Sequence, residues 1–320
     1  MKTITAHDHD LITSVVGEGL TTLPEAVLEK DLLVTEALRA IEAFDGASID
    51  AIFCGGTCLS KAHGLTDRMS EDIDFKLRVS EGLSRNARSR ALSHYKQRMI
   101  RHLEDLGFHI PPEEVIARDE NSYIGLNIHY QSRFAQQLSL RPEIKVELNA
   151  HPPSLPTTRL NVGSMLDRFI PASPALLSLK CISIEETLAE KVLAFLRRTA
   201  QMQSGRNRAE YDDRLVRHLY DVAAIARATE TSPLLYATFQ RLALQDARQF
   251  RNQHPEFNHD PAGEMGKVIE ALRDKSDPFE RHYQEFVEEL VYGEPISFTE
   301  AKRVFIVLAE KLVGSITPNP

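Results

Sequence analysis

Two carboxylates separated by one residue are the clearest chemical signal in the sequence. Asp72 and Asp74 open the segment 72–79, in which apolar residues such as Ile73 and Phe75 alternate with polar ones. Residues two apart on a strand point to the same side, so we expect the two acids side by side. Carboxylates this close repel each other unless a cation relieves them. Because the ligands are all oxygens, we predict that the cation is Mg²⁺ (or Mn²⁺).

A glycine turn precedes the acids. Gly55, Gly56 and Thr57 follow the apolar run 49–54, which we interpret as a buried strand. Glycines let the backbone approach a phosphate closely, and a helix that begins near Thr57 offers unpaired N–H groups. The Thr57 hydroxyl adds a further donor. The fourteen residues between Thr57 and Asp72 allow a return to an adjacent strand, so a phosphate cradle and a metal site are expected to converge.

Glu147 is the natural third carboxylate. It lies on the polar face of a predicted strand at 142–149, which could pair beside the strand of Asp72 and Asp74. Three acids can hold two metal ions, one activating a hydroxyl and one holding a triphosphate, and Glu147 could also act as a general base. A simple surface ion pair between Glu147 and Lys145 is the alternative. The order and spacing of the glycine turn and the acid pair predict a site for metal-dependent nucleotidyl transfer.

The elements that must position these residues fall into two halves. Strands and helices alternate up to about residue 175, and helical periodicity dominates afterwards, beginning with a capping box at Ser183 and Glu186. We therefore predict a nucleotidyltransferase domain at 1–175 and a helical C-terminal domain at 176–320. The individual predictions are strands at 49–54, 72–79, 122–130 and 142–149, and helices at 24–44, 85–106, 214–228, 234–251, 262–275, 278–291 and 298–315. The polar stretch 201–213 is predicted to be a loop.

Composition excludes several classes of protein. The chain has 320 residues, 42% of them hydrophobic and 26% charged, and no apolar run approaches the roughly 20 residues of a membrane helix. The N-terminus lacks an apolar signal core, so we expect a cytoplasmic protein with no membrane partner. His7 to Asp10 resembles a metal cluster but, at a terminus, is expected to be solvated and disordered. No disulfide framework is expected among the three cysteines, Cys54, Cys58 and Cys181. Cys54 and Cys58 have the spacing of a zinc pair but are expected to be small buried side chains.

Local basic segments stand out against the net charge of −8. The predicted helix over 85–101 is the best candidate for contacting an RNA backbone, because phosphate contacts are mostly made by Arg and Lys. A solvated amphipathic face is the alternative. Its basic residues are Arg85, Arg88, Arg90, Lys96, Arg98 and Arg101. A second segment, 197–208, is an alternative surface for RNA or for a protein partner.

Several segments resemble the AbiEii/AbiGii nucleotidyltransferase toxin family, which includes the MenT-type toxins. The resemblance covers about residues 24–225. The matching segments are Glu29-Lys-Asp-Leu-Leu-Val-Thr35, Phe53-Cys-Gly-Gly-Thr57-Cys-Leu-Ser-Lys, Arg68-Met-Ser-Glu-Asp-Ile-Asp-Phe75, Ala189-Glu-Lys-Val-Leu-Ala194 and Arg217-His-Leu-Tyr-Asp221.

This resemblance implies a DNA-polymerase-β-like α+β fold with a mixed sheet, followed by a helical C-terminal domain. Members of the family act as toxins of toxin–antitoxin or abortive-infection systems, so a cognate antitoxin protein is an expected partner. MenT-type members transfer nucleotides from NTPs to tRNA 3′ ends. NTP and RNA, with tRNA first among RNAs, are therefore the expected substrates.

Roles for individual residues also follow from the resemblance. Asp72 and Asp74 would be metal ligands, with Glu147 a less defined third, and Gly55, Gly56 and Thr57 would hold phosphate. Lys191 and Asp221 match the lysine and aspartate of the family's later motifs. A lysine suits the negative charge of a triphosphate, and Asp221 could orient Lys191 or could simply pair with Arg217 four residues earlier. Arg68 could contact a phosphate.

Two other functions remain open at this stage. The same chemistry could modify a small-molecule or protein hydroxyl in place of RNA. Alternatively, the chain could be a non-catalytic module that binds a nucleotide or a partner, although binding alone does not require the paired acids Asp72 and Asp74.

Overall fold

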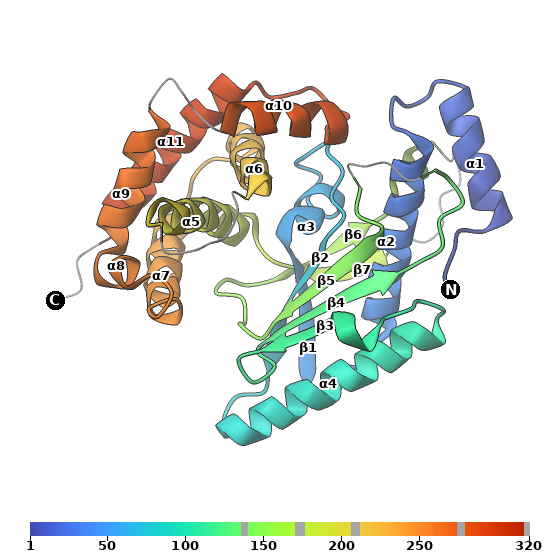
Figure 1. The fold of residues 1–320 in the computed structure, drawn as a ribbon, viewed down its shortest axis with the longest axis horizontal. Helices are drawn as coiled ribbons and strands as arrows, with labels where there is room; N and C mark the ends of the chain where they lie inside the picture. The colour runs from blue at the N-terminus through green and yellow to red at the C-terminus, as the bar shows by residue number, and fades with distance from the viewer. Residues whose placement is uncertain (136–139, 170–176, 206–211, 274–278, 317–320) are drawn as a thin grey trace. The chain divides into compact units, whose positions relative to one another are not determined.

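The computed structural model of the chain describes residues 1–135, 140–169, 177–205, 212–273 and 279–316 (Figure 1). The chain divides into two compact units. Unit 1 comprises residues 1–64 and 68–182, and unit 2 comprises residues 65–67 and 183–320. Unit 1 combines a sheet with helices, whereas the described residues of unit 2 form helices and no strand. The predicted α+β class with a mixed sheet and a helical C-terminal region is confirmed.

Unit 1 is built on a seven-stranded sheet with the order β3-β4-β5-β2-β1-β7-β6. The central strand β2 is antiparallel to β1 and parallel to β5, so the sheet is mixed. The strands are β1 (Ile49–Cys54), β2 (Ile73–Val79), β3 (Val115–Arg118), β4 (Tyr123–His129), β5 (Glu143–Asn149), β6 (Thr158–Val162) and β7 (Leu177–Cys181).

The four predicted strands are confirmed as β1, β2, β4 and β5. The sequence did not predict β3, β6 or β7. β3 and β6 are short and mostly exposed, so they lack the buried alternation that marks a half-buried strand. β7 does alternate, but it lies just beyond residue 175, where the sequence placed the change to helical structure. Unit 1 continues to residue 182 and therefore includes β7.

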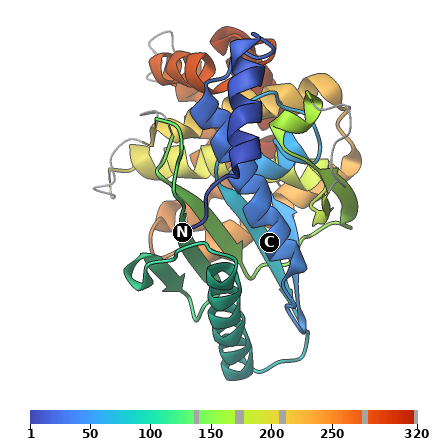
Figure 2. The ribbon, with the colours of Figure 1, turned by 90° about the vertical axis from the view of Figure 1, so that its right-hand side faces the viewer.

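The two faces of the sheet differ. Ile41 of α2 (Glu25–Ala43), Tyr95 of α4 (Arg85–Asp105) and Phe75 of β2 line one pocket, so these helices cover the face that carries Phe75 (Figure 2). Side chains alternate along a strand, which places Asp74 on the opposite face. Glu147 is the register partner of Asp74 on β5 and shares that face. The core and the predicted site therefore lie on opposite sides of one sheet.

The N-terminal residues form a helix, contrary to the expectation of disorder. α1 (Ala6–Gly17) begins with a capping box between Thr5 and Asp8 and buries Ile12 and Val15. The ring of His9 stacks on Phe134 at 4.6 Å between centroids. The histidine–aspartate run was misread because Asp8 serves as a helix cap rather than as a solvated acid.

Unit 2 contains the predicted C-terminal helices, which begin at the Ser183 cap. Its core includes Phe195, whose ring contacts Phe279 and Phe305 at centroid distances of 5.2 and 4.7 Å. Of the predicted loop at 201–213, residues 201–203 continue α5 and residues 206–211 lie outside the described part. The helices are α5 (Ile184–Gln203), α6 (Val216–Ala228), α7 (Pro233–Gln249), α8 (Pro255–His259), α9 (Pro261–Leu272), α10 (Phe279–Leu290) and α11 (Phe298–Gly314). None of the helices described in either unit is long and apolar enough to span a membrane.

Lys30 of α2 is a fully buried lysine at the centre of unit 1. Its amine donates to Glu71 Oε2 at 2.9 Å and to the carbonyls of Arg141 and Glu143 at 2.5 and 2.9 Å. A lysine has three donors and no acceptor, so all three are satisfied. Burial lowers the pKa of Lys30, and the charge and hydrogen bond of Glu71 oppose that shift. This ammonium joins α2 to the segment just before β2 and to the start of β5.

The neighbours of Lys30 make equivalent cross-chain contacts. Glu29 is buried and accepts a hydrogen bond from the backbone N–H of Arg133 at 2.7 Å. Asp31 forms an ion pair with Lys61 at 2.5 Å and accepts from the backbone N–H of Met165 at 2.6 Å. Three consecutive charged residues of α2 are thus buried, and each is bound to a different segment of unit 1.

We predict that Lys30→Met destabilises the fold by about 3–5 kcal/mol, because Glu71 would remain as a buried charge without its partner. Urea-induced unfolding followed by circular dichroism measures the change. The matched control is Arg39→Met on the same helix, where the exposed pair with Glu36 should contribute less than about 1 kcal/mol. Equal losses in the two variants would show that the buried pair has no special role.

Candidate active site

The turn after β1 can be formed only by glycine. Gly55 has φ of +76°, a left-handed conformation that disfavours other residues. A Cβ atom at this position would also lie 2.1 Å from Asp74 Oδ2. Cys54, the last residue of β1, is the register partner of Asp74. The carboxylate of Asp74 therefore lies directly against the backbone of the turn.

Thr57 connects the same turn to the other acid. It is fully buried, and its hydroxyl donates to the backbone carbonyl of Asp72 and lies 2.9 Å from Ser70 Oγ. The sequence suggested this hydroxyl as a donor to phosphate. In the structure it positions the backbone of Asp72 instead, so any phosphate contact at Thr57 falls to the backbone N–H.

Arg68 lies behind the turn. A Cβ atom at Gly56 would lie 2.6 Å from Arg68 Nη2, and Arg68 Nη1 donates to the Met69 carbonyl at 3.0 Å. Arg68 is only 2% exposed. Any side chain at Gly56 would displace the guanidinium of this buried arginine, which adds positive charge beneath the predicted phosphate cradle.

Asp72 has a cationic partner that the sequence did not indicate. Arg141 Nη1 donates to Asp72 Oδ1 at 2.7 Å, and the Asp72 side chain is 31% exposed. Arg141 stands 69 residues from Asp72 and belongs to no motif that we recognised. No signal in one sequence could have identified the pair.

Glu147 lies beside Asp74, as expected. The two residues are register partners on the parallel strands β2 and β5. Glu147 accepts a hydrogen bond from the Tyr123 hydroxyl at 2.8 Å and forms an ion pair with Lys145. Tyr123 reaches Glu147 across Gly125, where a Cβ atom would lie 3.3 Å from the tyrosine oxygen. The alternative of a Glu147–Lys145 pair is therefore confirmed, together with proximity to Asp74.

The pKa of Glu147 favours a charged role. Burial would raise this pKa, but the hydrogen bond and charge of Lys145, together with the Tyr123 hydroxyl, outweigh burial and lower it. The pKa of Tyr123 is raised because the phenol is buried and faces the Glu147 carboxylate. The lowered pKa makes Glu147 a weaker base, which suits an electrostatic or ligand role better than that of a general base.

The carboxylates of the site have the chemistry of a hard-cation site with two protein ligands. Asp72 and Asp74 supply oxygen ligands, and Mg²⁺ is commonly bound by one or two carboxylates with water and phosphate oxygens completing its shell. Within the described residues, no group of three or more His, Cys, Asp or Glu side chains is placed to hold a metal ion. Glu147, the third ligand predicted from the sequence, is held by Tyr123 and Lys145.

Lys191 and Asp221 form a buried ion pair within unit 2. Lys191 Nζ of α5 lies 2.6 Å from Asp221 Oδ2 of α6, and their side chains are 9% and 0% exposed. The sequence suggested that Asp221 could orient Lys191, and this contact is present. Arg217, the alternative partner, lies over the ring of Phe286 at 5.9 Å.

The basic helix α4 offers less free charge than its sequence suggests. Arg85 pairs with Glu120, Arg88 donates to the Ala150 carbonyl, Lys96 donates to Asn121, and Arg98 pairs with Asp45. Arg90 and Arg101 are exposed. α4 also lies on the face of the sheet opposite Asp74.

The second basic segment is similarly engaged. Arg197 is held by Asp246 at 3.0 Å over the ring of Phe250, and Arg198 pairs with Asp212. Arg206 and Arg208 lie outside the described residues. Cys54 and Cys58 are buried thiols, as expected, and Cys181 is buried as well.

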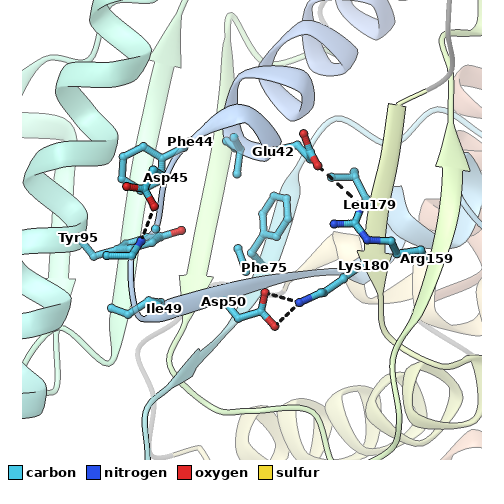
Figure 3. Close-up of a pocket in the computed structure, with 14 residues that line it drawn as sticks. Glu42, Phe44, Asp45, Ile49, Asp50, Phe75, Tyr95, Arg159, Leu179 and Lys180 are labelled. Atoms are coloured by element: carbon cyan, nitrogen blue, oxygen red, sulfur yellow. Dashed lines mark hydrogen bonds and ion pairs between the residues drawn. The ribbon is translucent and has the colours of Figure 1, made fainter.

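A pocket of about 250 Å³ lies at the other end of β1 (Figure 3). Asp50 of β1 and Lys180 of β7 meet across it at 2.7 and 2.8 Å, and Arg159 lies 3.7 Å from Glu42. None of the predicted site residues lines this pocket. Two ion pairs, Asp50 with Lys180 and Glu42 with Arg159, account for four of its charged side chains.

Comparison with known proteins gives the family and the fold of the chain. The family model described as "Nucleotidyl transferase AbiEii toxin, Type IV TA system" matches residues 36–304. Among solved structures, the chain is similar to MenT4, a nucleotidyltransferase toxin from Mycobacterium tuberculosis H37Rv. The TM-score is 0.54 at 15% identity, and 96% of this chain and 93% of that chain are covered. At this identity the likeness shows the fold alone. No sequence among the curated proteins matches. Because the family model spans most of the sequence, the chain belongs to the AbiEii nucleotidyltransferase toxin family.

Proposed function

We propose that the protein transfers a nucleoside monophosphate from an NTP to the 3′ hydroxyl of RNA, with the tRNA acceptor end as its target, and thereby blocks translation. The observation that carries this proposal is that one turn contacts both acids. Gly55 lies against the Asp74 carboxylate, and Thr57 holds the Asp72 carbonyl. A triphosphate bound at this turn would lie beside both carboxylates.

Asp72 and Asp74 would hold a divalent cation, Mg²⁺ or Mn²⁺. Bound there, the cation would neutralise phosphate charge and lower the pKa of the attacking hydroxyl. The backbone N–H groups of Gly56 and Thr57 would bind phosphate, with the buried charge of Arg68 behind them. Glu147, ionised beside Asp74, would add to the negative potential that favours the cation.

The acceptor surface is better placed on the acid-bearing face than on α4. Arg78 of β2 alternates with Asp74 and lies on its face. Its side chain is 46% exposed and lies 3.8 Å from the Asp50 carboxylate. Arg118 of β3 is exposed and lies 5.8 Å from the Tyr123 ring centroid. We therefore revise the predicted RNA surface from α4 to this face.

The toxin–antitoxin family also implies an antitoxin partner for the chain.

The transfer reaction is tested directly. Purified protein, Mg²⁺ and total tRNA are incubated with each of four α-labelled NTPs, and the RNA is resolved on a denaturing gel. We expect labelled tRNA, and we expect Asp74→Asn to reduce labelling by about 100-fold or more, because a metal ligand is removed. Label on no RNA, from protein that binds NTP, would instead favour a small-molecule or protein acceptor. Failure to bind NTP would favour the non-catalytic module.

The pair Lys191–Asp221 is proposed to act in catalysis, with Lys191 binding triphosphate charge, and one double variant separates this role from a structural one. Lys191→Ala should destabilise the protein by about 3–5 kcal/mol, because Asp221 would stay buried and unpaired. Lys191→Met with Asp221→Leu replaces both charges, so thermal stability should recover. We expect nucleotidyl transfer to be lost in Lys191→Ala and not to return in the double variant. Recovery of transfer together with stability would assign the pair a structural role only.

The revised RNA surface is tested by matched double variants on the two faces of unit 1. Arg78→Ser with Arg118→Ser should weaken tRNA binding and reduce the salt slope of log K by about 2. Arg90→Ser with Arg101→Ser removes the same charge from α4 and should have a smaller effect. The reverse order would restore α4 as the RNA surface, and no effect from either pair would argue against an RNA acceptor.

A further inference from the structure

The backbone of Arg141 is held by two hydrogen bonds that do not involve its side chain. Its N–H donates to Glu71 Oε2 at 3.0 Å, and its carbonyl accepts from Lys30 Nζ at 2.5 Å. Lys30 and Glu71 form the buried ion pair described above, with side chains 0% and 4% exposed. The Cα atom of Arg141 is therefore held rigidly next to the residue that precedes Asp72.

The guanidinium of Arg141 has a more exposed setting. It donates to Asp72 Oδ1 at 2.7 Å, and the side chains of Arg141 and Asp72 are 16% and 31% exposed. A long side chain on a fixed backbone can change its partner without moving the fold. The contact engages one of the carboxylate oxygens that the family's chemistry assigns to a cation.

The charges of the site require such a partner. Asp74 and Glu147 are register partners on β2 and β5, Asp72 directly precedes β2, and neighbouring carboxylates repel one another unless positive charge is near. Lys145 supplies this charge to Glu147, and Arg141 supplies it to Asp72. A divalent cation would make the charge of Arg141 redundant at Asp72 and would release a guanidinium within reach of the same site.

We propose that Arg141 binds the triphosphate of the nucleotide substrate, and that it serves as the counterion of Asp72 until nucleotide and cation bind. This inference rests on the proposed function. The guanidinium suits both partners because its planar donors match the oxygens of carboxylate and phosphate equally. Its exchange from one to the other would keep Asp72 neutralised in the free enzyme.

If Arg141 exchanges Asp72 for the triphosphate, removing its charge should change the affinities for cation and nucleotide in opposite directions. In the free protein, Arg141 competes with a divalent cation for Asp72. Arg141→Gln should therefore tighten Mn²⁺ binding without nucleotide, on the order of threefold to tenfold, because a neighbouring positive charge is lost. The same variant should weaken binding of a non-hydrolysable α,β-methylene NTP in saturating Mn²⁺ by about tenfold or more, because a charge-assisted contact is lost.

Both constants are measured on the full chain, Mn²⁺ by electron paramagnetic resonance and the NTP analogue by calorimetry. Arg141→Gln should fold normally, since Glu71 and Lys30 contact the Arg141 backbone, and circular dichroism verifies this. Arg141→Lys keeps the charge, so it should retain part of the nucleotide affinity. Arg303→Gln, at an exposed site of α11, is the control and should change neither constant.

Opposite shifts in Arg141→Gln support the proposal. Weaker binding of both ligands would mean that Arg141 only organises the site. Unchanged dissociation constants for Mn²⁺ and for the NTP analogue would mean that Arg141 contributes to neither binding event. Either result overturns the exchange. If the wild-type protein binds neither Mn²⁺ nor the analogue, the proposed function itself fails. The wild-type measurement therefore separates failure of the proposed function from failure of the role proposed for Arg141.

Discussion

The ion pair between Lys30 and Glu71 is the interaction on which the rest of unit 1 depends. A fully buried ammonium is tolerated only when its donors are satisfied, and those of Lys30 are used by Glu71 and by the carbonyls of Arg141 and Glu143. These contacts connect α2 to the chain before β2 and before β5. The two strands that carry the acids are thereby held to the same helix, and their parallel register follows.

The register then determines the chemistry. Asp74 and Glu147 are partners across β2 and β5, and the turn at Gly55 packs on Asp74 because glycine leaves no Cβ atom there. Repulsion among the acids is balanced within unit 1 by Arg141 and Lys145. Basic side chains of unit 1 therefore offset part of the negative charge of the acids. The carboxylates still offer the oxygen ligands that a divalent cation would use.

Basic residues in a sequence are not the same as available positive charge. α4 is rich in arginine and lysine, yet four of its six basic side chains between residues 85 and 101 bind other parts of unit 1. The helix also covers the face that buries Phe75. Arg78 and Arg118 belong to no basic cluster in the sequence, but strand alternation places both on the acid-bearing face. The position of a basic residue in the fold therefore matters more for a proposed RNA surface than the number of basic residues near it in the sequence.

The sequence alone determined the features that depend on local pattern. An apolar run before two glycines identified β1, and alternation identified β2, β4 and β5. The glycine turn and the Asp72–Asp74 pair marked the site, and the motifs around Lys191 and Asp221 indicated the family. Short exposed strands such as β3 and the capped helix α1 were missed because their signals are weak or resemble solvated chain. The tertiary structure alone decided which charges meet. Arg141 reaches Asp72 across 69 residues and Lys30 reaches Glu71 across 41, and the spacing of residues in one chain does not specify partners that are brought together only when distant segments pack.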